Sequence, residues 1–433
     1  MTQRRNAAAE APLDLRDKGV PGLAGPTPLG DVGARGWNLL AEDLPLPAAV
    51  IRRGALHHNS GWMRDFIARR NLALAPHGKT TMAPALFDLQ LDDGAWGITV
   101  GTPHQFQVAR SFGYRRLFLA NQLVGRAAID YVVTELRDHP DCEFYCLVDS
   151  VANVAALAAA ARRLRLPRPL TVLVERGYAG GRTGCRTQAE ALAVARAVAG
   201  SDGALALAGV EGFEGLFKEA TPAATAARVS AFLDDVVALA RACGDEGLFG
   251  DGPVILSAGG SAFYDLVAER FGAAALGRAT TVLLRSGCYI THDSIMYVKA
   301  FDALRARDPA LAATDGGLRP ALEVWGYVQS RPEAGKAIVG LGKRDLSHDD
   351  LPLAQHWYRP GETATPQPLG EGHVVTRLND QHCHLTVPAQ SPLQVGDMVA
   401  FGISHPCLTF DKWRAIHLVD DDYRVVDTIR TYF

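Results

Sequence analysis

The sequence predicts an α/β protein, in which a (β/α)₈ barrel of the TIM type is followed by a second, mostly β domain. The chain has 433 residues, which is more than one hydrophobic core usually serves. Short apolar runs alternate with alanine-rich helical stretches over roughly 240 residues, a length typical of such barrels. After Tyr289 the pattern changes to alternating, turn-rich segments that are typical of β-strands. An open, doubly wound sheet is the alternative for the first part.

The barrel is expected to begin with a β-α-β step. Residues 49–51 form a strand candidate, residues 56–70 carry apolar side chains at helical spacing, and residues 72–75 form the next strand. Further strands are expected at 97–100, 117–120, 144–148, 170–174, 205–210, 254–257 and 281–284. The clearest helices lie at 151–165, 188–198 and 223–242. Each helix is long enough to return the chain to a parallel neighbour.

The expected organisation is an arm at residues 1–45, the barrel at 46–290 and the β-domain at 291–433. The arm is rich in Pro, Gly and Ala and is expected to pack on the β-domain. Strands of the β-domain are expected at 321–329, 336–341, 372–377, 384–387, 398–403 and 413–419. Residues 352–368 contain four prolines and predict a long surface loop.

The composition indicates a cytoplasmic protein that acts on small molecules. A net charge of -3 with 48% hydrophobic and 21% charged residues gives no bias toward nucleic acid or an anionic membrane. No apolar run reaches the roughly 18 residues of a membrane span, and the first ten residues lack the apolar segment of a signal peptide. The seven cysteines are scattered, which disfavours a disulfide framework and leaves thiols for packing or metal binding.

A lysine after the strand at 72–75 is the first candidate for chemistry. Pro76 and Gly78 end this strand, so the amine of Lys79 is expected at its carboxyl edge, where α/β folds keep their reactive groups. A lysine there can form a Schiff base with an aldehyde cofactor. An ordinary exposed lysine in a turn is the alternative.

A glycine-rich loop late in the barrel is a candidate phosphate site. It joins the strand at 254–257 to a helical stretch at 264–270. Small residues let backbone N–H groups approach an anion, and the helix N-terminus adds favourable potential. The residues concerned are Ser257, Gly259, Gly260 and Ser261. Glycines that merely make the turn are the alternative.

Two further side chains follow barrel strands. Arg182 lies in a glycine-rich segment after the strand at 170–174, and its planar guanidinium suits a phenolate or carboxylate. Tyr289 follows the last barrel strand and can hydrogen-bond the same anion as the glycine loop. A solvated arginine and a buried core tyrosine are the alternatives.

Near the C-terminus, His405 and Cys407 form a candidate metal pair. Two ligands two residues apart in an extended segment project to the same side, so both can bind one divalent ion, with zinc the natural fit. Two protein ligands leave open positions for a substrate hydroxyl. Such pairs also arise by chance.

Together these motifs resemble the fold-type III pyridoxal-phosphate enzymes, the alanine racemase-like barrels, and within them the metal-dependent D-serine dehydratase and D-threonine aldolase group. The resemblance covers residues 45–425, approximately. Residues 76–80 (Pro-His-Gly-Lys-Thr) look like the Schiff-base lysine motif, 257–261 like the phosphate loop and 405–407 like the zinc pair.

The resemblance implies that Lys79 carries pyridoxal 5′-phosphate and that Arg182 lies near the phenolic oxygen of this cofactor. Tyr289 and the glycine loop would both lie near its phosphate. It implies Zn²⁺, Mn²⁺ or Co²⁺ on His405 and Cys407, and His382 as a catalytic residue close to the metal. It also implies a homodimer that takes a small D-amino acid as substrate.

Two segments depart from the family pattern. Phe213 stands where relatives usually have the tyrosine of a Tyr-x-Gly segment, so a hydroxyl near the ring is missing. Gln381-His382-Cys383 stands where relatives tend to have Glu-His-Gly. Cys383 or His384 can therefore enter the pocket, although a histidine in a strand is more often structural and packing is expected for His384.

The function that follows is a pyridoxal-phosphate- and metal-dependent dehydratase, or ammonia-lyase. Its expected substrate is a D-3-hydroxy amino acid such as D-serine, D-threonine or a bulkier analogue, and its products are a 2-oxo acid and ammonia. Alternatives are aldol cleavage to glycine and an aldehyde, racemisation, and a cofactor-binding protein without turnover. Cys407 favours the dehydratase, since the aldolases of this fold pair histidine with aspartate there.

Overall fold

The structure is a computed structural model that describes residues 11–22, 25–312 and 316–433. The chain forms two compact units. The first contains residues 64–79 and 90–287, and the second contains the described part of 11–63 together with 80–89 and 288–433. None of the helices in the described ranges combines the length and apolar character needed to cross a bilayer.

The first unit is built on a parallel sheet of eight strands in the order β2-β9-β8-β7-β6-β5-β4-β3. The strands are β2 (Ala73–Leu74), β3 (Ile98–Val100), β4 (Arg116–Gln122), β5 (Glu143–Val148), β6 (Leu170–Arg176), β7 (Leu205–Gly212), β8 (Val254–Ala258) and β9 (Thr280–Leu284). Hydrogen bonds join the two ends of this order, from Trp96 N to Leu74 O (2.7 Å) and from Thr99 N to Pro76 O (3.0 Å). The sheet therefore closes, which confirms the predicted barrel.

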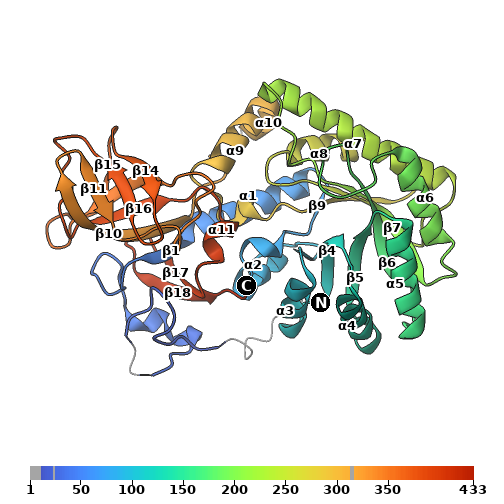
Figure 1. Cartoon of the computed structure of the whole chain (residues 1–433), viewed down its shortest axis with the longest axis horizontal. Helices are drawn as coiled ribbons and strands as arrows, with labels where there is room; N and C mark the ends of the chain where they lie inside the picture. The colour runs from blue at the N-terminus through green and yellow to red at the C-terminus, as the bar shows by residue number, and fades with distance from the viewer. Residues whose placement is uncertain (1–10, 23–24, 313–315) are drawn as a thin grey trace. The chain divides into compact units, whose positions relative to one another are not determined.

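Helices lie on the outside of this barrel (Figure 1). They are α3 (Pro103–Ser111), α4 (Arg126–Asp138), α5 (Val151–Arg163), α6 (Gln188–Ala199), α7 (Pro222–Asp245) and α8 (Tyr264–Gly272). Polar residues start several of them, as in the capping box of Thr187 and Glu190 at α6. Apolar side chains from several strands, such as Phe118, Leu147 and Leu283, fill the barrel interior. Because the interior is packed, ligands have to bind at its rim.

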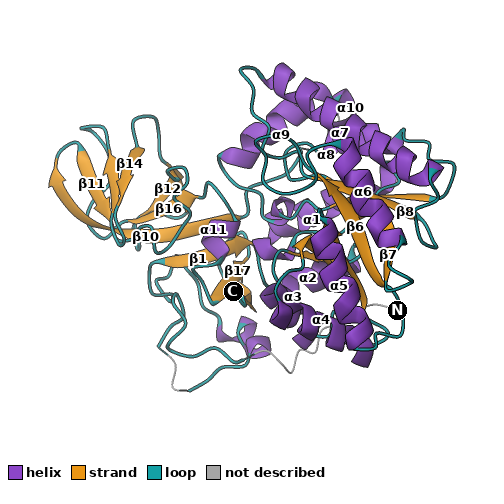
Figure 2. Ribbon diagram, turned by 45° about the vertical axis from the view of Figure 1, so that its right-hand side comes forward, coloured by secondary structure: helices purple, strands orange, loops and turns teal. Residues whose placement is uncertain are grey.

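The second unit is rich in β-strands (Figure 2). Its ten-stranded sheet follows the order β13-β12-β16-β10-β1-β17-β18, with β11, β15 and β14 branching from β10. The strands are β1 (Ala48–Arg52), β10 (Leu322–Glu333), β11 (Lys336–Val339), β12 (Leu353–Tyr358), β13 (Gln367–Pro368), β14 (Val374–Leu378), β15 (Cys383–Thr386), β16 (Met398–Gly402), β17 (Ala415–Val419) and β18 (Val425–Arg430). This unit confirms the predicted second, mostly β domain.

Helical elements complete the second unit. They are the α-helices α9 (Met296–Arg307), α10 (Pro309–Ala312) and α11 (Cys407–Phe410) and the 3₁₀ helices η2 (Leu29–Asp31), η3 (Gly33–Arg35) and η5 (Cys288–Ile290). α1 (Arg53–Arg69), α2 (Pro84–Asp92) and η4 (Gly78–Thr80) connect the two units along the chain. Leu13, Val20 and Leu39 from the N-terminal segment pack into one core cluster with Trp325 and Met398.

Two expectations need correction. The strand at 49–51 exists as β1, but it pairs with β10 and β17 in the second unit and not with the barrel. Its residues are almost fully buried, and an apolar run of this kind does not tell which sheet it joins. Residues 352–368 are not a structureless loop, since they contain β12 and β13. The latter holds Pro368 at a sheet edge, where proline is tolerated. The predicted boundaries at residues 45 and 290 stay a prediction.

Candidate cofactor site and metal centre

The lysine predicted as cofactor anchor lies in η4, at the carboxyl end of β2. Lys79 is exposed, so its amine is open to a ligand. Burial lowers the pKa of the nearby His77 well below its ordinary value, and the charges of Lys79, Arg285 and Arg182 lower it further. These three cations therefore act on one region of the barrel unit. Such a concentration of positive charge suits an anionic ligand.

The predicted phosphate loop lies between β8 and α8, as the sequence indicates. Gly259 has a φ of +96°, and a Cβ at this position would stand 2.8 Å from Leu284 Cδ2, so only glycine fits. The backbone N–H groups of Gly259 and Gly260 donate to the carboxylate of Glu214 at 3.2 and 2.8 Å. The loop amides thus already converge on the oxygen atoms of one carboxyl group.

The serines of this loop differ in their surroundings. Ser257 is buried, and its hydroxyl donates to Leu283 O (3.1 Å) and accepts from Arg285 Nε (3.0 Å). Ser261 is half-buried in the loop itself. Ser257 is therefore held within the barrel by neighbouring strands, whereas Ser261 remains the serine better placed for a ligand.

The residues present fit pyridoxal phosphate. Amides that bind a carboxylate also bind a phosphate, and the cationic side chains complement its charge. Burial raises the pKa of Glu214, while hydrogen bonds from backbone amides, including those of Gly259 and Gly260, lower it. A raised pKa favours the neutral carboxyl, which reduces its repulsion of a phosphate beside it.

Arg182 is exposed in the loop after β6, and its guanidinium lies over the ring of Phe213, 4.4 Å from the ring centre. Phe213 is the residue that replaces the family's tyrosine. The aromatic face therefore holds the arginine through a cation–π contact. Positioning of Arg182 does not require the missing hydroxyl.

A buried ion pair lies on the neighbouring strands. Arg285, just after β9, contacts the carboxylate of Glu211 at the end of β7. Burial raises the pKa of Glu211 to about 8, an effect that Arg285 opposes. The sequence does not predict this ion pair, because the two residues are 74 positions apart and neither belongs to a recognisable local motif.

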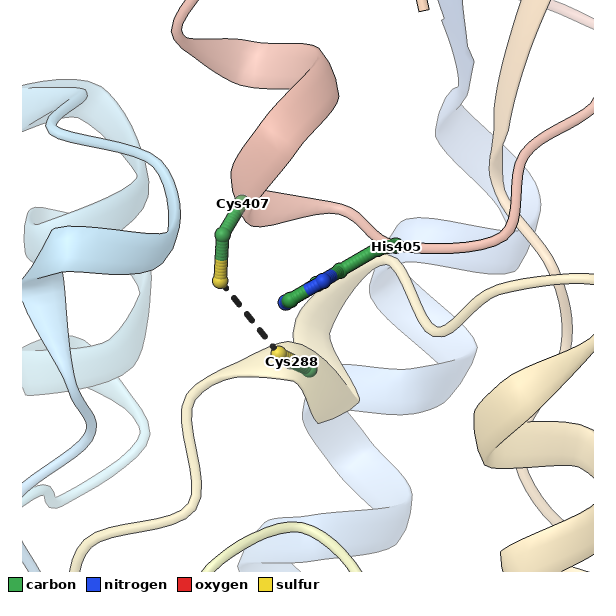
Figure 3. A group of neighbouring side chains, drawn as sticks. All are labelled: Cys288, His405 and Cys407. Atoms are coloured by element: carbon green, nitrogen blue, oxygen red, sulfur yellow. Dashed lines mark hydrogen bonds between the residues drawn. The ribbon is translucent and has the colours of Figure 1, made fainter. Parts of the chain in front are cut away.

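The second unit brings His405 and Cys407 together with Cys288 (Figure 3). One ligand atom from each lies within 4.8 Å of the others, and the Sγ atoms of the two cysteines are 3.8 Å apart. Thr80 Oγ1 lies 3.8 Å from Cys288 Sγ and 3.6 Å from Cys407 Sγ. Among the described residues these three side chains form a group able to hold a metal ion. Their nitrogen and sulfur donors suit zinc.

The pair meets for a reason other than the one the spacing suggests. Pro406 has helical dihedral angles (φ -58°, ψ -47°), and α11 begins at Cys407. The segment is therefore a helix start and not an extended strand. The turn at Pro406 brings the side chains on either side of it toward one centre.

Asp349 orients His405. Its Oδ2 lies 2.7 Å from His405 Nδ1, and its Oδ1 accepts from Ser404 Oγ at 2.9 Å. Burial would raise the pKa of Asp349, but these hydrogen bonds outweigh it and lower the pKa below its ordinary value. The ionised carboxylate holds the proton on Nδ1 and leaves Nε2 free for a metal, an arrangement common in zinc proteins.

The remaining predicted residues also lie in the second unit. Tyr289 is buried in η5. His382 is exposed in the hairpin between β14 and β15, outside the group formed by Cys288, His405 and Cys407. Cys383 is buried in β15, and His384 Nε2 lies 2.7 Å from Asn379 Oδ1, which agrees with a packing role for His384. The catalytic roles stay predictions.

Sequence reasoning missed Cys288 and Asp349 as members of the candidate metal centre. Cys288 directly follows Gly287 after the last barrel strand and is 119 positions from Cys407. Asp349 is 56 positions from His405. The one available signal was that Cys288 is an unassigned thiol at the carboxyl end of a barrel strand.

Comparison with known proteins identifies the fold. Residues 321–419 match the sequence model of the family described as "Putative serine dehydratase domain". A D-threonine aldolase from Filomicrobium marinum superposes with a TM-score of 0.73 at 22% identity, over 92% of this chain and 96% of the aldolase. The chain has the fold-type III, alanine racemase-like fold.

Further solved structures agree with this fold-type III assignment. The D-threo-3-hydroxyaspartate dehydratase from Delftia sp. HT23 has a TM-score of 0.70 at 23% identity, over 91% of this chain and 99% of that one. An alanine racemase-like protein from Idiomarina loihiensis has a TM-score of 0.68 at 16% identity, over 89% and 96%. Curated protein sequences give no match. The resemblance inferred from the motifs is thereby confirmed, and the segment that matches the family model contains His405 and Cys407.

Proposed function

We propose that this fold-type III protein is a pyridoxal-phosphate- and divalent-metal-dependent lyase. It converts a D-3-hydroxy amino acid into a 2-oxo acid and ammonia. The observation that carries the proposal is the imidazole–thiol group of His405 and Cys407, oriented by Asp349, inside the segment that resembles a serine dehydratase domain. One similar structure, a dehydratase of D-threo-3-hydroxyaspartate with a cysteine replaced by alanine, is described as metal-free, which supports a metal role for a cysteine.

Different residues of the chain would have different roles in this reaction. Lys79 would hold the cofactor, and its Nζ would take the α-proton of the substrate. The amides of Gly259 and Gly260, once released from Glu214, would bind the phosphate together with Ser261, and Arg182 would balance negative charge on the ring. When bound, the cofactor supplies an electron sink and the metal supplies a Lewis acid for the substrate's hydroxyl. Lys79 directly precedes Thr80, whose hydroxyl contacts both cysteines of the metal centre.

Product analysis tests the reaction. The protein is incubated with D-threonine and Zn²⁺, and we expect 2-oxobutyrate and ammonia in equal amounts. Glycine with acetaldehyde would overturn the dehydratase in favour of aldol cleavage, and L-allo-threonine alone would indicate inversion at the α-carbon, as a racemase would cause. Samples with L-threonine as substrate or without metal are the controls, and neither is expected to release oxo acid.

Covalent trapping tests the cofactor. Borohydride reduction of the protein after incubation with pyridoxal phosphate should fix the cofactor on one lysine, and peptide mass spectrometry should locate it at Lys79. Labelling elsewhere, or none, would remove Lys79 from the proposal.

We also infer a homodimer, as in the group that the chain resembles. Light scattering should give twice the chain mass of 46.4 kDa. A monomer that is fully active would contradict this inference without touching the proposed reaction.

A further inference from the structure

The third side chain of the metal centre has no role in the proposed reaction so far. Cys288 lies in η5, is 5% exposed, and places its Sγ against that of Cys407. We propose that Cys288 is a third protein ligand, which makes the centre a Cys₂His site with a single open position. The inference rests on the proposed metal dependence and adds a ligand to it.

The spacing of the two sulfurs carries the proposal. Two thiolates bound to tetrahedral zinc at about 2.3 Å lie about 3.8 Å from each other. The Sγ atoms of Cys288 and Cys407 are 3.8 Å apart. A disulfide would bring them to about 2.05 Å, so the present separation excludes a disulfide and matches that of two ligands of one ion.

The third ligand atom and its support complete the set. His405 lies within 4.8 Å of both sulfurs, and its Nδ1 is engaged by Asp349 at 2.7 Å. The nitrogen that remains for a metal is Nε2. The imidazole is thus prepared for coordination by the same carboxylate–histidine arrangement that other zinc sites use.

Contacts around Cys288 hold its side chain in place. Thr80 Oγ1 lies 3.8 Å from Cys288 Sγ, and the side chain of Tyr297 interacts with the same thiol. Burial and these two neighbours leave the thiol fewer accessible rotamers than an exposed cysteine has. This lowers the entropy that metal binding would otherwise cost.

A third ligand changes the chemistry of the centre. Two thiolates and one imidazole select zinc over manganese, because soft sulfur ligands disfavour the harder ion. Three protein ligands leave one position on a tetrahedral ion, as in catalytic zinc sites. The substrate would therefore offer a single oxygen to the metal, whereas a site with two protein ligands leaves room for two.

X-ray absorption at the zinc edge tests this ligand set directly. Full-length protein is kept reduced and loaded with one equivalent of Zn²⁺. We expect two sulfur ligands at about 2.3 Å in the unaltered protein, and one in Cys288→Ser. Cys383→Ser is the matched control, because Cys383 is also buried but lies in β15, outside the group; it should retain two sulfurs.

Two solution measurements provide a second test of the number of sulfur ligands. In Co²⁺-loaded protein, the thiolate charge-transfer absorbance should fall by about half in Cys288→Ser, since it scales with the number of bound thiolates. The dissociation constant for zinc should rise by at least the ~10–100-fold typical of losing an outer partner of a ligand. The Cys383→Ser protein should show neither change.

The outcomes separate the two proposals. One sulfur in the unaltered protein would overturn the role of Cys288 and leave the two-ligand metal of the proposed function intact. Failure to bind zinc at all would overturn both. If Cys288→Ser does not fold, the sulfur count of the unaltered protein still decides.

Discussion

At the metal centre, a single carboxylate determines which nitrogen of a histidine is available. Asp349 accepts from Nδ1 of His405, and it also receives a hydrogen bond from Ser404. Asp349 is therefore expected to be a positioning residue that acts through His405. Its contribution should appear in metal affinity before it appears in the rate of reaction.

Replacing Asp349 by Asn tests this role. The neutral amide accepts more weakly from Nδ1–H, so the affinity for Zn²⁺ should fall about 10–100-fold, as measured by competition with a coloured chelator. The exposed neighbour Asp350, changed to Asn, is the matched control and should bind zinc normally. Equal affinity of the two variants would show that the carboxylate does not orient the imidazole.

The proposed role of Lys79 as cofactor anchor and base can be tested by a single substitution. Lys79→Arg keeps the positive charge but cannot form a Schiff base, so covalent cofactor attachment should vanish and the rate should fall at least about 10²–10⁴-fold. Both are measured by cofactor absorbance and oxo-acid release. Lys336→Arg, in a partly exposed ion pair with Glu333, should retain both properties. Full activity in Lys79→Arg would exclude this lysine as anchor and base.

At the scale of single elements, the loop between β8 and α8 depends on one glycine. Gly259→Ala would force an L side chain into φ +96° and bring its Cβ to 2.8 Å from Leu284 Cδ2. The strain of about 1–3 kcal/mol should move the loop and weaken pyridoxal phosphate binding about tenfold or more, measured by spectrophotometric titration.

A second glycine provides the control for this loop. Gly277 also has a positive φ (+69°), but a Cβ there meets nothing within 4 Å. Gly277→Ala should therefore cost backbone strain without changing cofactor affinity. If both variants bind the cofactor as the unaltered protein does, the loop is not the phosphate site.

Strand β17 contains a pH-sensitive contact with the N-terminal segment. His417 is buried, its Nε2 lies 3.0 Å from Gly19 O, and its Nδ1 lies 2.7 Å from Thr428 Oγ1. Burial lowers the pKa of His417 to about 4 from 6.5. Between pH 6.5 and pH 4, His417 is mostly protonated in the unfolded chain but mostly neutral in the folded chain. Its contribution to the free energy of unfolding is therefore fully present above pH 6.5 and is lost as the pH falls toward 4.

The predicted loss is measurable. Between pH 7 and pH 5, His417 should reduce the free energy of unfolding by about 2 kcal/mol. Denaturant unfolding of His417→Gln should lack this part of the decrease, whatever its stability at pH 7. His292, whose pKa burial also lowers to about 4, contributes equally to both proteins and cancels. Parallel pH dependences in the two proteins would contradict the prediction.

At the scale of the whole molecule, a metal would tie together distant parts of the second unit. Cys288 begins η5, and Cys407 begins α11. A ligand that binds only the folded state stabilises it by about 2.7 kcal/mol at a hundred times its dissociation constant. Since the chain has two compact units, its thermal unfolding need not be a single transition.

Metal removal therefore has a predicted thermal effect. Adding excess EDTA to the zinc-loaded protein should lower the midpoint of one unfolding transition by several degrees, measured by calorimetry. His405→Ala should unfold at the same temperature with and without zinc. An EDTA effect of equal size in this variant would place the bound metal elsewhere.

Most of the barrel could be predicted because its signals are local. Apolar runs, helical periodicity and strand-ending residues such as Pro76 and Gly78 act within a few positions. The prediction of the β-domain was less complete, since β12 lies in a proline-rich stretch and α9 follows the barrel without a clear break in the sequence pattern. In the site, the lysine motif and glycine loop are contiguous, so their positions were predictable.

The sequence by itself determined most of the barrel's strands and helices, the position of the candidate phosphate loop and two residues of the candidate metal centre, because each depends on neighbours along the chain. Tertiary structure alone decided that β1 joins the second sheet, that Glu214 occupies the amides of the glycine loop, and that Cys288 and Asp349 meet His405 and Cys407. These pairings join residues that are tens to hundreds of positions apart. The local sequence pattern does not distinguish the correct partner from many other possible partners, and only long-range packing selects it.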